Sequence, residues 1–423
     1  MVIIDSSRLP LSQHFFAPIA KIADSCPSAR SCPELSDDAW LRFGITRILD
    51  DEPSGRAFLQ SIRADWEDTP ARSSFFDTLA SDRRLRLCRE ANATLCVTMG
   101  RTIPDPLAVY SALDGYAVFA GDGHFHAAAV HDPRNADGTK YATGHLYALN
   151  LRSHAMHHLD VGDQKERKKE HDMRTLKRQS PAALRFGTPT GTKVILVWDK
   201  AGIDFAWWLK CKNTSSIYFI SRPKDNMVFE NGPPCPWDTA ATVNTGIVAD
   251  ELVAPATHMR YVRRVTYINP VSGEYWQFLT NEMKLPPGLI AKLYLMRWDI
   301  EKVYDEFKNK LLEKKAWASS ATAKCMQGVF LCLAHNLMVL QEEELRIDHG
   351  ITNAGENRRR AKRLTEEENA VQKAGRVLSP LRKALQRCTQ RTVKFIRWLR
   401  TYLLREIPYI RLVAVLREEY RNL

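Results

Sequence analysis

The segment KVILVWD at residues 193–199 constrains the fold of this chain most strongly. Five apolar residues follow one another without a polar interruption, and an acid closes the run. Strands that are apolar at successive rather than alternate positions are usually covered on both faces, as in parallel sheets. The segment therefore predicts a central strand whose sheet has helices on both sides.

The neighbouring segments predict an α/β arrangement. Apolar bursts rich in β-prone residues occupy 116–132, 144–161 and 217–222, whereas 165–178 and 203–210 have helical character. From residue 116 the predicted order is strand, strand, strand, helix, strand, helix, strand. This order is typical of a sheet flanked by helices.

The length of 423 residues suggests more than one domain. Residues 1–105 are predicted to be mostly helical, and 106–345 to form the α/β domain. A turn-rich, strand-like stretch at about 222–283 interrupts this domain as a β-rich insertion, with a hairpin around PVSG at 270–273. Residues 346–423 are predicted to form a basic helical region.

The charge balance favours a polyanionic partner. The chain holds 61 Lys and Arg against 49 Asp and Glu, a net charge of +12, and nucleic acid is the simplest partner for such a surplus. Residues 165–178 are strongly basic. A second basic stripe follows one helix face at four- and three-residue intervals: Lys383, Arg387, Arg391 and Lys394. A solvated helix face explains either patch alone, but the two together favour contact with phosphates.

The sequence predicts a cytoplasmic protein with no membrane partner. Its apolar runs are too short and too interrupted for a membrane span. The N-terminal residues lack the basic and apolar regions of an export signal. Nine cysteines at irregular spacing, without a CxxC pair, are typical of reduced thiols in the cytosol.

The segment YLMRWDIEKVYDEFK at 294–308 is predicted to lie in one long helix over 285–312, followed by another at about 320–341. At about 100° per residue, four polar side chains fall within an arc of roughly 60°: Tyr294, Arg297, Glu301 and Lys308. A separate apolar stripe, which includes Ile300, Val303 and Phe307, faces the core. One interpretation of the polar arc is a surface edge with an Arg297–Glu301 salt bridge.

Three acids suggest a metal-dependent site. Asp122 lies between two glycines in a strand-like segment, Asp199 ends the buried strand, and Glu301 lies on the polar helix arc. Carboxylates at strand ends facing a helix acid form the oxygen-rich cage that Mg²⁺ prefers, and two such ions support in-line phosphoryl displacement. A simple cap or turn is the alternative for Asp199. Asp114, Asp204 and Asp305 are nearby competitors.

The combination of these motifs resembles a known family. Tyr294-x2-Arg297-x3-Glu301-x6-Lys308, with RW and IE in place, is similar to the Y-R-E-K signature of bacterial DDE transposases of the large insertion-sequence family named for its fourth member. That family also places its first Asp in an apolar strand before Gly and its second after a buried strand. The resemblance covers about 116–312.

The resemblance implies an RNase H-like catalytic core, a mixed sheet with flanking helices, interrupted by the β-rich insertion. It implies Asp122, Asp199 and Glu301 as ligands of two Mg²⁺ ions, for which Mn²⁺ is expected to substitute. Three residues of the signature are expected to hold the phosphates beside the scissile bond: Tyr294, Arg297 and Lys308.

Trp276 occupies the position from which hairpin-forming relatives stack a tryptophan on a base flipped from the DNA end. A buried core tryptophan is the alternative. The loop after Asp199 departs from the family, because DKAGIDF replaces an Asp-Arg-Gly-Phe-like run. The acid is kept, but the conformation of the loop after it is left open.

The resemblance predicts a cut-and-paste transposase that cleaves the inverted-repeat ends of its element and joins their 3′ hydroxyls to target DNA. A homodimer is expected, with residues 1–105 recognising the ends and the C-terminal helices dimerising and contacting phosphates. A nuclease that cuts without joining is one alternative. An inactive transposase-derived DNA-binding protein is the other.

Seven histidines cluster in the strand region and raise the question of zinc: His124, His126, His131, His145, His154, His157 and His158. No HExxH motif or paired cysteine spacing accompanies them. We expect most of them to be strand-face residues or polar DNA contacts.

Overall fold

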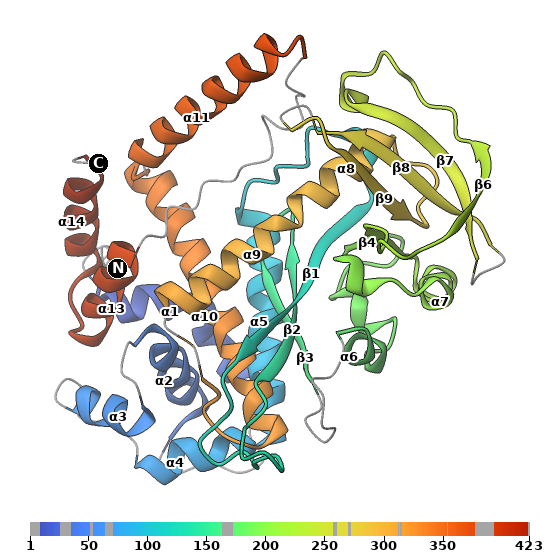
Figure 1. The fold of residues 1–423 in the computed structure, drawn as a ribbon. Helices are drawn as coiled ribbons and strands as arrows, with labels where there is room; N and C mark the ends of the chain where they lie inside the picture. The colour runs from blue at the N-terminus through green and yellow to red at the C-terminus, as the bar shows by residue number, and fades with distance from the viewer. Residues whose placement is uncertain are drawn as a thin grey trace.

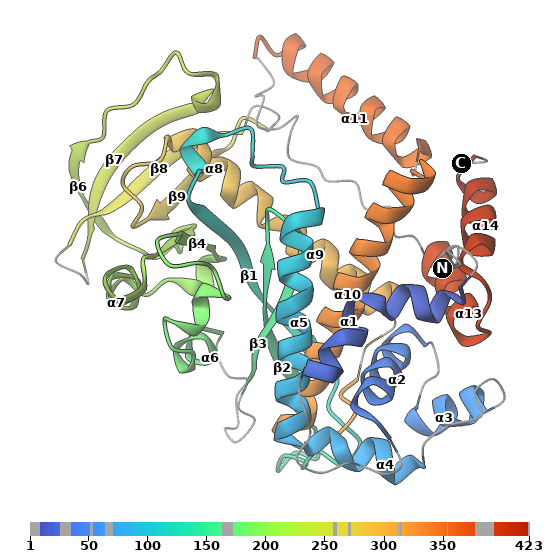
Figure 2. The ribbon, with the colours of Figure 1, turned by 180° about the vertical axis from the view of Figure 1, so that it is seen from behind.

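A computed structural model describes residues 9–25, 35–50, 54–63, 71–162, 172–256, 260–269, 272–311, 313, 315–352, 354–376 and 393–421. A strongly twisted sheet runs through the middle of the molecule, with helices on both sides (Figures 1 and 2). The described part is therefore a mixed α/β fold, as the strand and helix order predicts.

The sheet contains nine strands in the order β3-β2-β1-β4-β5-β9-β8-β7-β6. Strands β1, β4 and β5 are parallel, and the other neighbours are antiparallel. The strands are β1 (Tyr116–His126), β2 (Thr143–Asn150), β3 (Met156–Val161), β4 (Lys193–Val197), β5 (Ile217–Ser221), β6 (Phe229–Pro234), β7 (Ile247–Pro255), β8 (Val262–Ile268) and β9 (Tyr275–Thr280).

Strand β4 is buried on both faces, which confirms the prediction from KVILVWD. Ile195 and Val197 belong to the core beneath α8 (Pro287–Met296), α9 (Trp298–Asp305) and α10 (Ala321–His349). Val194 and Leu196 belong to a second core, formed with α6 (Asp172–Arg178) and α7 (Phe205–Ser215) on the other face.

The N-terminal part is helical, as predicted, and packs on the long core helix α10. Its helices are α1 (Leu11–Ser25), α2 (Asp37–Leu49), α3 (Gly55–Arg63), α4 (Arg72–Phe76) and α5 (Asp82–Thr102). Helix α10 is the one described helix long and apolar enough to cross a membrane, but 94% of its apolar window is buried inside the fold. Its apolar surface is thus explained by the core.

The C-terminal helices meet the N-terminus. Beyond α10 the described chain forms α11 (Ala354–Lys373), α13 (Val393–Leu404) and α14 (Tyr409–Arg421). Pro10 and Pro408 form a β-bridge, and the rings of His14 and Tyr409 stack 3.9 Å apart. Lys383, Arg387 and Arg391 lie outside the described residues, and so does the Lys394 side chain.

Strands β6–β9 extend the sheet beyond β5 through the stretch that the sequence marks as turn-rich and strand-like. Ile268 pairs with Tyr275 next to the predicted turn, so the hairpin around residues 270–273 is confirmed. Strand β9 pairs with β5. This extension is therefore continuous with the central sheet (Figure 1).

The prediction of one continuous helix over 285–312 is wrong. Helix α8 ends at Met296, α9 begins at Trp298, and residues Glu306–Lys310 form a π-helical turn. No Pro or Gly lies between 289 and 312, so no local helix breaker explains these interruptions. Side-chain contacts with other elements explain them: Arg297 bonds to Asp122, and buried Glu306 bonds to His335 on α10. The predicted apolar stripe, including Ile300, Val303 and Phe307, is buried.

Buried histidines make the fold sensitive to acid. Burial holds the pKa of His126 and His145 well below the ordinary value, and lowers that of His157 to about 4 and that of His158 to about 3. These groups stay neutral in the folded state while the unfolded chain binds protons below about pH 6.5.

We therefore expect the free energy of unfolding to fall as pH drops from 6.5 towards 4, on the order of 1.4 kcal/mol per pH unit for each such histidine. Urea unfolding at several pH values measures this loss. A His157→Asn variant should show a shallower pH dependence over this range. An unfolding free energy independent of pH between 6.5 and 4.5 would contradict the expectation.

Candidate active site

Parallel pairing brings Asp122 and Asp199 to the same level of the sheet. The paired residues of β1 and β4 end with Ala120 opposite Val197. Asp122 stands two residues further along β1, which continues to His126, so it does not end a strand as the sequence pattern suggested. Asp199 stands two residues after Val197, just beyond the end of β4. Because side chains alternate along extended backbone, Asp122 lies on the face of Ala120 and Asp199 on the face of Val197. This is the face covered by α8, α9 and α10.

A buried tryptophan just after the end of β4 packs against the middle of β1. Trp198 is fully buried. A Cβ added to Gly121 would lie only 1.8 Å from its ring, and one added to Gly202 only 2.3 Å. The indole therefore packs directly on both glycines. Gly121 and Trp198 are the residues that directly precede Asp122 and Asp199. This contact requires glycine and sets how β1 meets the end of β4.

We expect Gly121→Ala to displace Asp122, because the new methyl group overlaps the Trp198 ring. Overpacking of this kind costs about 1–3 kcal/mol of stability, and a misplaced reacting group can cost about 10²-fold in rate. Thermal unfolding measures the first effect, and cleavage of DNA, the activity that the resemblance implies, measures the second. Gly100→Ala is the matched control, because nothing lies within 4 Å of its added Cβ on α5. Equal behaviour of the two variants would show that the Trp198 contact is unimportant.

Helix α9 supplies Glu301 to the same place. The Tyr304 hydroxyl donates a hydrogen bond of 2.7 Å to the Asp122 carbonyl oxygen, which ties α9 to β1. Arg297 lies between the two elements. One guanidinium nitrogen is 3.1 Å from Asp122 Oδ2, and the other is 2.9 Å from Glu301 Oε1.

The carboxylates of Asp122 and Glu301 therefore both point to the Arg297 guanidinium. The Arg297–Glu301 salt bridge expected as the simple interpretation is therefore present. The same guanidinium also bonds to Asp122, which lies 175 residues earlier in the sequence.

Asp199 also acts as a cap. Its Oδ1 accepts a hydrogen bond of 2.9 Å from Ala201 N at the start of a 3₁₀ turn, Lys200–Gly202. The cap proposed as the alternative for Asp199 is therefore confirmed. Its negative charge still reaches the other groups, because it raises the pKa of both Asp122 and Tyr294. Asp199 is half-buried beside them.

The environment raises the pKa of Asp122 to about 6. Burial is the largest cause, and the negative charges of Asp199 and Glu301 add to it. Arg297 and the Gly123 N–H act in the opposite direction. A carboxyl surrounded by other carboxylates in a partly dry site is strongly stabilised by any cation that binds among them.

The donor set fits a divalent cation in its chemistry. Three carboxylates offer the hard oxygen ligands that Mg²⁺ and Mn²⁺ take, and two of them already converge on the Arg297 guanidinium. Among the residues that the structure describes, no three His, Cys, Asp or Glu side chains are arranged around one metal position. Asp122, Asp199 and Glu301 could hold such an ion after Arg297 moves away from them.

The other residues of the polar arc lie at different depths. Tyr294 is half-buried, with its ring 5.0 Å from that of Phe278 and the Arg297 guanidinium 5.9 Å above it. Lys308 is exposed in the π-helical turn. The pKa of His124 is lowered to about 4, mainly by the burial of its ring and also by the positive charge of Lys308. The arc of four residues is therefore spread along α8, α9 and the turn.

Trp276 is half-buried and packs on the edge of the core under α8. The Arg222 guanidinium lies 5.5 Å from its ring, and its Nε1 donates to Glu274 Oε2 at 3.4 Å. Burial raises the pKa of Tyr294, and the positive charges of Arg297 and Arg222 oppose this shift. Trp276 is thus close to the polar arc without being enclosed by the core.

The competing acids have other partners or positions. Asp204 caps α7 through Trp207 N at 2.9 Å and pairs with Lys177. Asp305 accepts a hydrogen bond of 2.6 Å from Asn309, and Asp114 is exposed in the turn before β1. The geometry therefore favours Asp122 and Asp199 as the strand acids.

Five of the seven histidines lie on strands β1, β2 and β3, as expected. His145 and His158 contact each other at 3.1 Å, and His154 Nε2 lies 3.8 Å from Asp299. Tyr304 and Trp198, which the sequence pattern did not identify, position the acids through contacts with the Asp122 carbonyl oxygen and with Gly121. The one local signal was that Gly121 and Trp198 directly precede the two aspartates.

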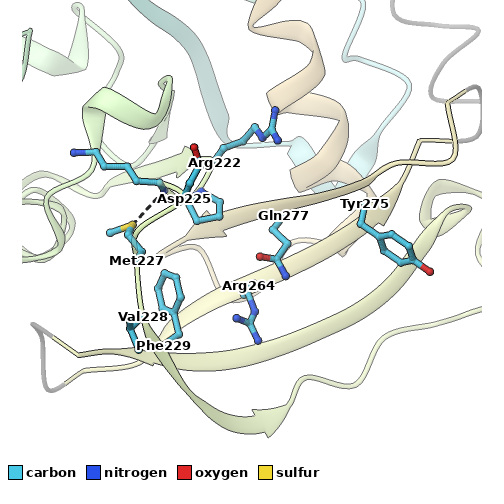
Figure 3. A pocket seen from close by; sticks show the side chains of 10 residues that line it. Arg222, Asp225, Met227, Val228, Phe229, Arg264, Tyr275 and Gln277 are labelled. Carbon is cyan, nitrogen blue, oxygen red and sulfur yellow. Dashed lines mark hydrogen bonds between the residues drawn. The ribbon is translucent and has the colours of Figure 1, made fainter.

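A hollow of about 520 Å³ lies over the face of β9 that carries Tyr275 and Gln277 (Figure 3). Three cationic side chains line it, Arg222, Lys224 and Arg264, with Tyr275 and Gln277 from β9. Asp225 is the one acid in its lining. The hollow is therefore electropositive, and Arg222 connects it to Trp276.

Comparison with known families identifies the domain that holds this site. A family model described as a transposase DDE domain matches residues 115–337, which is more than half of the chain. No curated protein sequence matches the chain. The matched range includes β1, β4 and α9 and therefore all three acids. The chain belongs to the transposase DDE domain family.

Proposed function

We propose that the protein is the cut-and-paste transposase of a bacterial insertion sequence with the Y-R-E-K signature and an RNase H-like core. One observation carries this proposal. Asp122 and Glu301, remote in sequence, converge on Arg297 beside Asp199 inside the transposase DDE domain. A cage of carboxylates with an adjacent guanidinium suits the transfer of a phosphoryl group.

In this proposal two Mg²⁺ ions are bound by Asp122, Asp199 and Glu301, and Mn²⁺ can replace them. Bound there, the metal supplies an activated attacking oxygen and stabilisation of the leaving oxygen. The three carboxylates orient the reacting phosphate beside β1 and α9. Trp198 fixes the position of β1 relative to the end of β4, and Tyr304 fixes the position of α9 relative to β1.

Arg297, Tyr294 and Lys308 hold the phosphates next to the scissile bond. The guanidinium is suited to this because its planar fork forms two parallel hydrogen bonds with phosphate oxygens. Trp276, half-exposed beside Tyr294, stacks on a base displaced from the DNA end. Arg222 next to it adds positive charge.

The remaining parts recognise DNA and assemble the complex. Residues 1–105 recognise the inverted-repeat ends, and 346–423 dimerise in the cytoplasm of the host cell. The stripe of Lys383, Arg387, Arg391 and Lys394 adds phosphate contacts. The net charge of +12 supports DNA as the partner.

The experiment combines the full-length protein with DNA carrying the ends of its element, Mg²⁺ and a target plasmid. Joined products with the element ends covalently linked to the plasmid are expected. Nicked ends without any joined product would instead support a nuclease. Absence of both, with retained DNA binding, would support an inactive DNA-binding protein. Short inverted repeats flanking the reading frame would supply the end sequence.

A further inference from the structure

Helix α11 stands apart from the sheet in both views (Figures 1 and 2). It follows α10, contacts α14 near its base and ends near the turn between β8 and β9. There the Arg376 guanidinium lies so close to Gly273 that an added Cβ would come within 2.8 Å. Among its described side chains, most are exposed and Val371 is buried.

After Glu356 in its first turn, the charges of α11 form a basic run and then an acidic run. Five of the six residues from 358 to 363 are basic, and none is acidic: Arg358, Arg359, Arg360, Lys362 and Arg363. Three acids follow at 366–368. Lys362 and Glu366 pair at 4.0 Å with 79% and 63% of their side chains exposed, so this pair contributes little stability.

This arrangement is unfavourable for an isolated helix. Cations in the N-terminal half oppose the helix dipole, and like charges four residues apart, such as Arg358 and Lys362, repel each other. A polar helix of 20 residues with most of its described side chains exposed is marginal on its own. A polyanion along the basic half would relieve the repulsion.

The chemistry of the helix points to one kind of polyanion. Membrane-surface helices require a broad apolar face, whereas the apolar residues larger than alanine in α11 are Leu364 and the buried Val371. It also has no Phe, Tyr or Trp, so it cannot stack on the bases of a single strand. Phosphates on the outside of a duplex need neither feature.

We infer that the basic half of α11, residues 358–363, binds the phosphate backbone of double-stranded DNA. These residues belong to a different helix from Glu301 and lie before the basic stripe at 383–394 in the sequence. The inference rests on the proposed function only in that the protein acts on duplex DNA.

The test measures binding of the full-length protein to a duplex without metal at a series of salt concentrations. Arg358, Arg360 and Lys362 are all replaced with Gln, which has similar helix propensity. We expect the slope of log K against log salt to become shallower by about 3, with at least tenfold weaker binding at low salt. The control replaces Glu366, Glu367 and Glu368 with Gln and should bind at least as tightly as wild type.

An unchanged slope in the basic variant, with an unchanged melting temperature, would overturn the inference. Joining activity of the wild-type protein is measured in parallel. An unchanged slope together with active wild type refutes the α11 surface alone. A shallower slope with inactive wild type supports the surface and refutes the proposed transposition. Wild type that fails to bind duplex DNA refutes both.

Discussion

Glu301→Gln is expected to abolish DNA cleavage while leaving the fold intact. The substitution keeps the shape of the side chain and removes the charge that, with Asp122, surrounds one cation position. Loss of one ligand of a catalytic metal costs several kcal/mol of transition-state stabilisation, which corresponds to about 10³-fold or more in rate. A nicking assay on supercoiled DNA carrying the element ends measures the loss.

Asp305→Asn is the matched control for Glu301→Gln. It removes one negative charge from the same helix, at an exposed position that bonds to Asn309. It should cleave at the wild-type rate, and both variants should melt within a few degrees of wild type. Cleavage by Glu301→Gln at the wild-type rate would refute the assignment of Glu301.

Arg297→Gln is expected to change metal binding and cleavage in opposite directions. In the structure the guanidinium neutralises Asp122 and Glu301 through bonds of 3.1 and 2.9 Å. Hydrogen bonds to charged groups contribute about 1.5–3 kcal/mol. Without this competing cation, the DNA-free variant should bind Mn²⁺ on the order of tenfold or more tightly. Its cleavage rate should fall by about 10²-fold, because the scissile phosphate loses its guanidinium.

Calorimetric titration with Mn²⁺ in the absence of DNA separates the two effects. Lys302→Gln is the control, because Lys302 lies on the same helix but pairs with Asp299 at 2.7 Å. It should bind Mn²⁺ as wild type does. Mn²⁺ binding by Arg297→Gln that is no tighter than wild type would show that Arg297 does not compete with the metal. The result expected here implies that bound DNA phosphate, by drawing Arg297 away, prepares the acids for metal.

Local sequence pattern predicted the elements well where burial follows a simple period. The uninterrupted apolar run of β4 marked a strand covered on both faces, and the stripe through Ile300, Val303 and Phe307 marked the buried side of α9 and the turn after it. The turn chemistry of residues 270–273 marked the β8–β9 hairpin. These features depend on neighbours within a few residues.

Features that depend on distant contacts were not predictable from pattern. The break at Arg297 and the π-helical turn arise from partners on β1 and α10. The packing of Trp198 on Gly121 depends on the register of β1 and β4, in which the paired residues Ala120 and Val197 are 77 residues apart in sequence. Nothing in the local sequence distinguishes Asp122 bonded to Arg297 from an exposed strand-end acid.

The most direct test of the central claim uses DNA ends that are already cut. The full-length protein, a precut element end and a target plasmid are combined with Mg²⁺, and the end carries either a 3′ hydroxyl or a 3′ hydrogen. If Asp122, Asp199 and Glu301 direct a 3′ hydroxyl onto target phosphate, joined product forms only with the hydroxyl and disappears in Glu301→Gln. Equal joining from both ends, or joining by Glu301→Gln at the wild-type rate, would contradict this account.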